Sequence, residues 1–456
     1  MHNIDIDIVD MALDVVKFAI SRITETDPKL GFPKKEEELQ ELVGETITAK
    51  GIGGEKAFAL FRDVLLKASV SIDHPRHLAF VPASPTRAAI MFDLVTSASC
   101  IHGAFWMEGA GGIFAENQAM KWLVSLTGMP DKAFGVFTSG GTAANLSAMV
   151  AAREDWRGRD ESNRTRRGLV ITSDGAHSSI KAMAKVIDAD VMAVETENRF
   201  EAADLAFALE KLSGDDRKRL FAVISTAGTT NAGIVDDLDG IADICRPENV
   251  WFHVDAAYGG GALLAPSVRH LFNGIEEADS ITIDPHKWLF APYDCGAVIY
   301  RDPSVAKKAH SQEGSYLDIF KGETNGFNPS EYQIQLTRRL RGLPLWFSLA
   351  MHGTERYSKA VEDGIALAQT AGRIISETGH VELVREPSLS CVLFRRNDWQ
   401  PDDYWSWTYK NHRDGFALVA PTRWGHGENA ETVARFCFIN PDTTEQDIKG
   451  ILATMN

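Results

Sequence analysis

Short apolar runs alternate with helical patterns through the middle of the chain. Each run has the length of a strand, and helical spacing of apolar positions follows several of them, as after Thr142 and Ser178. Strands that are apolar throughout are typical of a sheet covered by helices on both faces. The pattern therefore predicts an α/β fold with a mostly parallel central sheet. The expected strands are 135–138, 168–172, 190–194, 220–224, 250–254, 280–283 and 296–300.

The two ends of the chain have other patterns. Apolar residues at helical spacing predict an N-terminal helical dimerisation segment, residues 1–72. A long helical stretch is expected near 338–367, and the residues after it have mixed α+β patterning. We therefore expect a large α/β domain at 73–345 and a small C-terminal α+β domain at 346–456.

Composition narrows the possible partners. The net charge of -16 over 456 residues argues against nucleic acid and against anionic membrane surfaces. The chain starts with acidic residues, unlike a secretory signal, and contains no apolar run long enough to span a bilayer. Its five cysteines are scattered and have no CxxC spacing. We expect reduced thiols, no metal site and a cytoplasmic location.

One lysine stands between a predicted strand and a run of bulky apolar residues. Lys287 belongs to SITIDPHKWLF, which begins as a strand and ends in bulky residues. A lysine can extend its charge to water along its apolar stem, and this alone would explain Lys287. Alternatively, burial lowers the pKa of the amine and leaves a nucleophile that forms Schiff bases. Residues elsewhere in the chain must decide between these two interpretations.

Other polar residues follow predicted strands at the same edge of the sheet. Asp255, His177 and Thr230 each come after a different strand, and open α/β sheets bind ligands at these carboxyl ends. Each residue also has a plainer explanation, such as a loop cap for Asp255 and a surface or packing role for His177. Their common edge favours a binding site.

A glycine turn opens the helix that follows the strand 135–138. In Ser139-Gly140-Gly141-Thr142, free backbone N–H groups and the helix dipole would bind an anion. The turn lacks the Gly-Lys-Ser/Thr of a P-loop, and such a junction can also serve close packing. An amine, an acid, an anion site and a flat ring together fit pyridoxal phosphate.

Six segments are similar to one enzyme family, the group II pyridoxal-phosphate decarboxylases, which include aromatic-amino-acid, histidine and glutamate decarboxylases. They read HVDAAYGGG, DPHKWLFAPYDCG, STAGTTNAG, RFCFINPDTT, HPRHLAFVPAS and RRLRGLPLWFSLAMHG, and they span most of the chain. The resemblance implies fold type I of the pyridoxal-phosphate enzymes. It also implies a homodimer with active sites at the interface, in which Gly353 and Thr354 approach the partner's phosphate.

The resemblance also implies a role for each matching residue. Lys287 would form the Schiff base, Asp255 would keep the pyridine nitrogen protonated, and His177 would stack on the ring opposite Ala257. Lys287, His177 and Asp255 are therefore the expected catalytic residues. The expected cofactor-binding residues are Gly140, Gly141, Thr142, His177, Thr230, Asp255, Ala257, Asp284, His286 and Lys287.

The implied reaction is decarboxylation of an L-amino acid to its amine and CO₂. Some family members carry a loop tyrosine that protonates the product carbon. Phe327 stands near that place here, flanked by Tyr316 and Tyr332. Decarboxylation with oxidative deamination to an aldehyde therefore stays open, although we favour the amine. We expect this loop, with Gly322 and Gly326, to be mobile and to close over the substrate.

Four residues are expected to contact the substrate: Phe80, His102, Phe327 and Arg435. Phe80 and Trp106 favour a flat or apolar side chain, while Ala104 enlarges the space and His102 adds polarity. Arg435 would meet a carboxylate, which guanidinium groups bind bidentately. The plainer explanations are a hydrogen-bonded helix-end histidine for His102 and a structural ion pair for Arg435.

Two other functions compete with amino-acid decarboxylation. A different fold-type-I lyase, such as a cysteine desulfurase, would need an exposed cysteine on a loop, which Cys295 does not provide. A binding protein without catalysis would have no use for Lys287, Asp255 and the glycine turn together.

Overall fold

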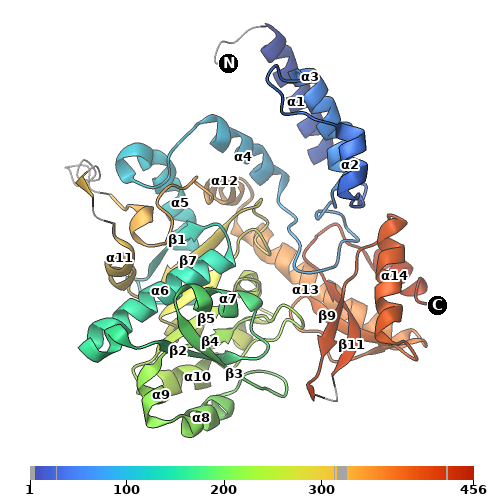
Figure 1. Ribbon diagram of the computed structural model, residues 1–456. Helices are drawn as coiled ribbons and strands as arrows, with labels where there is room; N and C mark the ends of the chain where they lie inside the picture. The colour runs from blue at the N-terminus through green and yellow to red at the C-terminus, as the bar shows by residue number, and fades with distance from the viewer. Residues whose placement is uncertain (1–5, 27, 313, 316–325, 428–429) are drawn as a thin grey trace.

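The computed structural model describes residues 6–26, 28–312, 314–315, 326–427 and 430–456. A seven-stranded sheet forms its centre, in the order β1-β7-β6-β5-β4-β2-β3 (Figure 1). Strands β2 to β6 run parallel, whereas β7 is antiparallel to both β1 and β6. The predicted α/β class is confirmed. The strands are β1 (Phe134–Thr138), β2 (Gly168–Ser173), β3 (Ala189–Val194), β4 (Leu220–Thr226), β5 (Trp251–Asp255), β6 (Ser280–Ile283) and β7 (Gly296–Tyr300).

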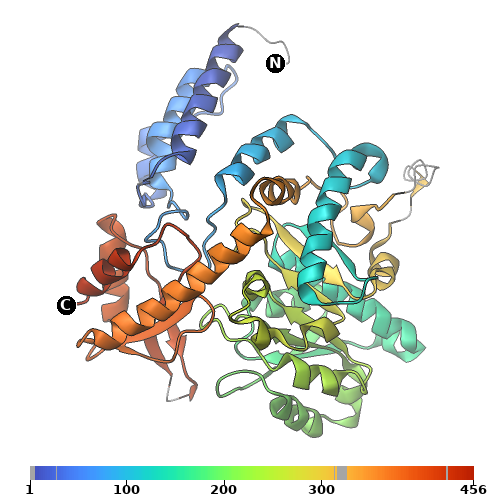
Figure 2. The same cartoon turned by 180° about the vertical axis from the view of Figure 1, so that it is seen from behind.

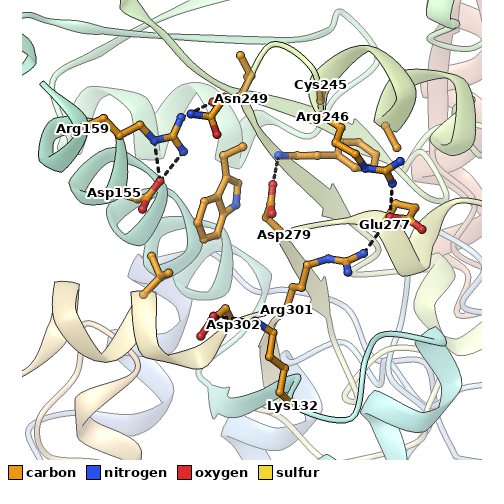
Figure 3. Close-up of a pocket in the computed structure, with 15 residues that line it drawn as sticks. Lys132, Asp155, Arg159, Cys245, Arg246, Asn249, Glu277, Asp279, Arg301 and Asp302 are labelled. Atoms are coloured by element: carbon orange, nitrogen blue, oxygen red, sulfur yellow. Dashed lines mark hydrogen bonds and ion pairs between the residues drawn. The ribbon is translucent and has the colours of Figure 1, made fainter.

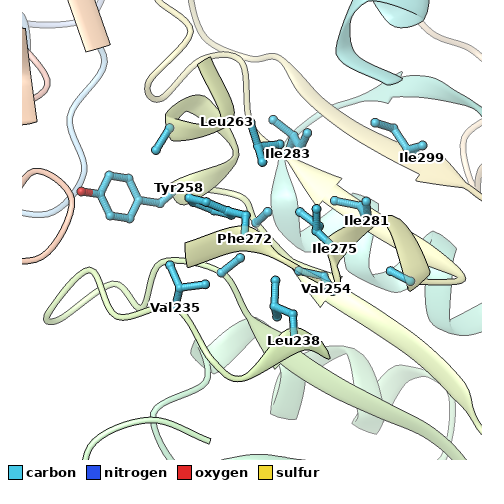
Figure 4. Packing of buried hydrophobic residues seen from close by; sticks show 14 of the residues in the cluster. Val235, Leu238, Val254, Tyr258, Leu263, Phe272, Ile275, Ile281, Ile283 and Ile299 are labelled. Atoms are coloured by element: carbon cyan, nitrogen blue, oxygen red, sulfur yellow. The ribbon is translucent and has the colours of Figure 1, made fainter. Parts of the chain in front are cut away.

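Both faces of this sheet are buried, which explains its uninterrupted apolar strands. On one face, Ile171 and Val223 join a core that Figure 4 shows around Phe272 and Ile281. On the other, alternate residues such as Val170 pack against helices of the opposite layer. The first core includes residues of α5 (Trp106–Thr127), α8 (Ala202–Lys211), α10 (Leu238–Cys245) and α13 (Thr354–Glu377), and the second those of α6 (Gly141–Arg159), α7 (Ser178–Val186) and α11 (Pro303–His310).

Three N-terminal helices project away from the sheet domain (Figures 1 and 2). They are α1 (Ile6–Ile23), α2 (Glu36–Val43) and α3 (Gly54–Leu60), and they agree with the helical pattern of residues 1–72. Next along the chain, α4 (Arg87–Ala98) leads into the sheet domain. Among all described helices, none combines the length and apolar character needed to cross a bilayer.

The C-terminal part has its own four-stranded sheet, in the order β10-β11-β9-β8, with antiparallel neighbours. The single helical stretch expected at 338–367 is wrong. It is two helices, α12 (Leu343–His352) and α13, because Gly353 between them has φ 74°, a conformation that glycine adopts readily. The other elements are β8 (Val381–Leu383), β9 (Cys391–Arg396), α9 (Gly214–Arg219), α14 (Pro401–Arg413), β10 (Pro421–Trp424), β11 (Glu431–Cys437) and α15 (Glu445–Ala453).

Candidate active site

A cavity of about 580 Å³ lies at the carboxyl edge of the parallel strands. It is bordered by the turn after β1, by residues that follow β2 and β4, by the end of β5 and by the loop after β6. All ten residues expected to bind the cofactor line it: Gly140, Gly141, Thr142, His177, Thr230, Asp255, Ala257, Asp284, His286 and Lys287. The topology therefore brings together residues that lie far apart in the sequence.

Lys287 extends into this cavity beside a carboxylate. Its Nζ lies 3.0 Å from Asp284 Oδ2, and its side chain keeps 22% exposure. Burial pushes the pKa of Lys287 down, but the carboxylates of Asp284 and Asp255 outweigh it, so the pKa is raised. The expectation of a lowered pKa is therefore wrong for this form of the protein. The two acids hold the amine as an ammonium group.

Asp255 is buried at the end of β5 and held by two donors. The Asn145 amide donates to Oδ2 at 2.9 Å, and the Ala257 N–H donates to Oδ1 at 3.1 Å. Behind Asn145, His253 Nε2 lies 3.0 Å from the amide oxygen, and burial lowers the pKa of His253 to about 4. A neutral imidazole thus fixes the amide that orients the carboxylate.

Sequence reasoning missed both Asn145 and His253. Two signals could have found them. His253 and Asp255 are two residues apart and share a face of β5, and Asn145 lies one helical turn after Thr142 on α6. Buried polar side chains at such positions require hydrogen-bond partners, so a buried His253 predicts a partner such as Asn145, and a buried Asn145 predicts a partner such as His253.

The start of α6 has the features that the predicted anion site requires. This helix begins at Gly141 without a hydrogen bond from a capping side chain, which leaves its first N–H groups free for a ligand. A Cβ on Gly141 would lie 2.8 Å from Asp284 Oδ2, which is too close. Only glycine therefore lets this turn pack against the lysine loop, the segment after β6 that carries Asp284 and Lys287. Within the described structure, Thr226 Oγ1 and Asp284 Oδ1 are buried without a hydrogen-bond partner. These features fit pyridoxal phosphate.

Two histidines border the cavity. His177 precedes α7, and its Nδ1 accepts from the Ser179 N–H at 3.2 Å, which fixes the imidazole. His286 Nδ1 lies 2.7 Å from the Cys295 carbonyl oxygen, and burial lowers the pKa of His286. Both rings are held in place before any ligand arrives.

A second cavity of about 360 Å³ lies at the opposite edge of the sheet (Figure 3). Its basic residues are paired with its acids. The pairs are Arg159–Asp155, Arg246–Glu277, Arg301–Glu277 and Lys132–Asp302. Because these charges neutralise each other, we place the active site in the first cavity.

Three of the residues expected at the substrate lie outside the cavity lining. Arg435 is buried and donates to the carbonyl oxygens of Asn231 and Phe80, so a substrate carboxylate does not reach it in this chain. Phe80 has φ 56° and a side chain that is 66% exposed. His102 Nδ1 lies 2.6 Å from Glu108 Oε2, as in the plainer explanation.

Phe327, the fourth, also lies outside the cavity lining. Its ring stacks on Tyr332 at 4.5 Å and meets Phe134 edge-on at 4.9 Å. The expectation that this segment has little to pack against is therefore wrong for residues 326–330, where Ser330 also donates to the Ala104 carbonyl oxygen. Tyr316 and Gly322 lie in 316–325, outside the described residues.

Comparison with known proteins gives one consistent result. Residues 44–397 match the model of the pyridoxal-dependent decarboxylase conserved domain. An aromatic-L-amino-acid decarboxylase of Bacillus atrophaeus is 34% identical over 84% of this chain and 80% of its own. An L-2,4-diaminobutyrate decarboxylase of Acinetobacter baumannii is 29% identical over 91% and 86%.

A solved structure, Oryza sativa TDC with pyridoxal phosphate and tryptamine, superimposes with a TM-score of 0.90 at 23% identity. It covers 100% of this chain and 99% of its own, and at this identity it supports the fold. Together with the family match and the cavity, these findings show that the chain belongs to the group II pyridoxal-phosphate-dependent decarboxylases and is a carboxy-lyase.

Proposed function

We propose that this carboxy-lyase converts an L-amino acid with an aromatic or other bulky side chain into its amine and CO₂. One observation carries the proposal: the Lys287 amine, the Asp255 carboxylate and the uncapped start of α6 border the same cavity. The relative at 34% identity supports an aromatic substrate. Because another relative is a diaminobutyrate decarboxylase, amino acids with a basic side chain must be tested beside the aromatic ones.

Each residue of the cavity has a role in the proposed reaction that follows from its chemistry. When bound, pyridoxal phosphate supplies an aldehyde for the substrate amine and a ring that accepts electrons from the breaking C–C bond. Lys287 would provide the amine that holds the cofactor aldehyde. Asp255 would hold a proton on the pyridine nitrogen, and the first N–H groups of α6 would hold the phosphate. His177 provides a flat face that keeps the reacting groups oriented.

We further propose a cytoplasmic homodimer with active sites at its interface. Support for the dimer comes from the exposed apolar residues of the N-terminal helices, since two-fold pairing is the commonest way to cover such surfaces. Free thiols, four of them buried, fit a reducing compartment.

The test is the Lys287→Ala variant with a panel of aromatic, acidic and basic L-amino acids. We expect CO₂ release to fall by at least a thousandfold, because the cofactor loses its resident amine, while the fold persists. The absorbance band of the cofactor–lysine adduct should disappear as well. Lys132→Ala, at the opposite edge of the sheet, is the matched control and should keep full activity. A Lys287→Ala enzyme with normal turnover would refute the proposal.

The same panel separates amine from aldehyde. We expect oxygen consumption near zero per CO₂ released, because several residue types can donate the proton to the product carbon and His177 lines the cavity. One O₂ consumed per CO₂, with ammonia and peroxide as products, would establish the aldehyde-forming reaction instead.

A further inference from the structure

Two cysteines face each other across neighbouring strands of the small sheet. Cys391 of β9 and Cys437 of β11 are register partners, and the backbone hydrogen bond from Phe438 to Ser390 belongs to the adjacent pair. Cys391 and Cys437 therefore form a pair without mutual backbone hydrogen bonds, whose Cα atoms lie about 4.5 Å apart. Disulfides span Cα separations of roughly 4.4–6.8 Å, so the two sulfurs can bond without backbone movement.

The surroundings of Cys391 favour a thiolate. Arg435 Nη2 lies 3.3 Å from Cys391 Sγ, and the Tyr258 hydroxyl lies 3.5 Å from it. Burial opposes ionisation, but hydrogen bonding from Cys437, the charge of Arg435 and the Tyr258 hydroxyl outweigh it and lower the pKa of Cys391 to about 6. The neighbouring Cys437 keeps its proton, because burial and the Cys391 charge raise its pKa.

This thiol pair lies below the border of the active site. Tyr258 follows Asp255 by three residues and stacks on Trp288, the neighbour of Lys287, at 5.3 Å. Arg435 also holds the carbonyl oxygen of Asn231, which directly follows the cavity residue Thr230. A change of charge at the sulfurs therefore acts on groups that support the cofactor site.

Both thiols are buried, and the loop 229–234 packs against one of them, since a Cβ on Gly233 would lie 3.2 Å from Cys391 Cβ. The outer side of this loop lines a cavity of about 510 Å³, with Asn231 and Ile234 in its wall. Hydrogen peroxide is small enough to pass when the loop opens locally.

We propose that Cys391 and Cys437 form a reversible redox site, which hydrogen peroxide converts to a cross-strand disulfide that lowers decarboxylase activity. The Cys391 thiolate attacks one peroxide oxygen, and the O–O bond breaks to give a sulfenic acid and hydroxide. The Cys437 sulfur then displaces the sulfenic oxygen, which takes the Cys437 proton and leaves as water, while the hydroxide of the first step passes to solvent with its negative charge. Two electrons pass from the sulfurs to peroxide. The product leaves Arg435 without its anionic partner.

The test treats the full-length holoenzyme with hydrogen peroxide, blocks remaining thiols and analyses the chain by mass spectrometry. We expect the oxidised chain to carry two blocking groups fewer than the reduced chain treated in the same way, with a Cys391–Cys437 cross-link in the peptide map. Activity should fall severalfold and return with dithiothreitol. No cross-link would overturn the site, and a cross-linked enzyme with unchanged activity would overturn its coupling to the active site.

Variants identify the role of each sulfur. Cys437→Ser should give no cross-link and should accumulate a sulfenic acid at Cys391 that dimedone labels. Cys391→Ser should give neither. Cys245→Ser is the matched control, since Cys245 is buried in α10 and burial raises its pKa, and it should keep the cross-link. A sulfenic acid at Cys437 in the Cys391→Ser variant would contradict the assigned roles.

Discussion

Asp255 depends on a series of buried polar side chains that begins well outside the cavity. Trp251 Nε1 and His253 Nδ1 each lie 2.8 Å from the Ser280 hydroxyl, and His253 continues through Asn145 to the carboxylate. Hydrogen bonds of this kind are stronger in a buried setting and are costly to interrupt. The orientation of Asp255 is therefore set by strand residues as well as by its own loop.

Replacing Asn145 with leucine tests this dependence. The change keeps the approximate size but removes the donor to Asp255, and a hydrogen bond to a charged group contributes about 1.5–3 kcal/mol, so we expect kcat to fall roughly tenfold to a hundredfold. Steady-state kinetics and cofactor titration measure the effect. Asn411→Leu, which removes a buried amide donor in α14, is the control for stability alone. Equal loss of kcat in both variants would rule out a positioning role for Asn145.

At the residue scale, the sequence identified the cofactor site better than the substrate site. Lys287 and Asp255 line one cavity, as the motifs predicted, because residue type and strand position suffice to place them at one edge of the sheet, and their roles there stay predictions. The motifs could not give the direction of the Lys287 pKa, which depends on Asp284 in three dimensions. Nor could they show that Arg435 bonds to backbone oxygens, since those partners lie in distant loops.

At the scale of elements, the start of α6 is packed so tightly against the rest of the site that it has no space for a side chain at Gly141. Its first turn lies against the lysine loop, and a methyl group placed on Gly141 would have Ala257 and Asp284 as its nearest neighbours. Its first N–H groups have no capping side chain, so in the proposed function this element would bind the phosphate through its backbone. A side chain here would change the distance between the helix and the loop.

Gly141→Ala should therefore weaken cofactor binding by about tenfold or more, since its Cβ would meet Asp284 Oδ2 at 2.8 Å and Ala257 Cβ at 3.2 Å. Titration of the stripped enzyme with pyridoxal phosphate, followed by absorbance, measures the affinity. Gly111→Ala in α5 is the control, because its Cβ would meet nothing within 4 Å. If Gly141→Ala binds pyridoxal phosphate as tightly as the unchanged enzyme, the turn can move to make room for the added methyl group, and the prediction is wrong.

The strands of the large sheet followed the apolar pattern closely, and all of them except β7 run in the expected direction. The strand expected at 168–172 is Gly168–Ser173 in the structure. The antiparallel β7 was not foreseen, although a connection from β6 without a long helix favours an antiparallel return. The break at Gly353 was also missed, because apolar residues continue at helical spacing on both sides of it. The boundaries at 72/73 and 345/346 stay predictions.

At the scale of the whole molecule, the N-terminal helices have an apolar surface that this chain leaves open. Phe18 and Phe58 pack together at 5.6 Å between α1 and α3, but Leu13 is 53% exposed and Ile47 is 90% exposed. Exposed apolar groups gathered on one projecting unit are typical of an interface.

We therefore expect the Leu13→Glu, Ile20→Glu double variant to weaken the dimer at least tenfold, because burying two carboxylates without partners is unfavourable. Sedimentation velocity at micromolar concentration gives the mass. Phe207→Glu, at a position that is 58% exposed on α8, is the control and should stay dimeric. A wild-type chain that is monomeric and fully active would disprove the interface.

The placement of β7 also sets the moment at which the enzyme can first be completed on the ribosome. Edge strand β1, which carries the phosphate turn, pairs with β7, and Thr138 lies opposite Gly296. Roughly 160 residues must be synthesised between these two partners, which at ~5–20 residues per second takes on the order of 8–30 s. Throughout that interval the nascent chain exposes an unpaired β1. We therefore expect chaperones to bind the nascent chain before it can bind its cofactor.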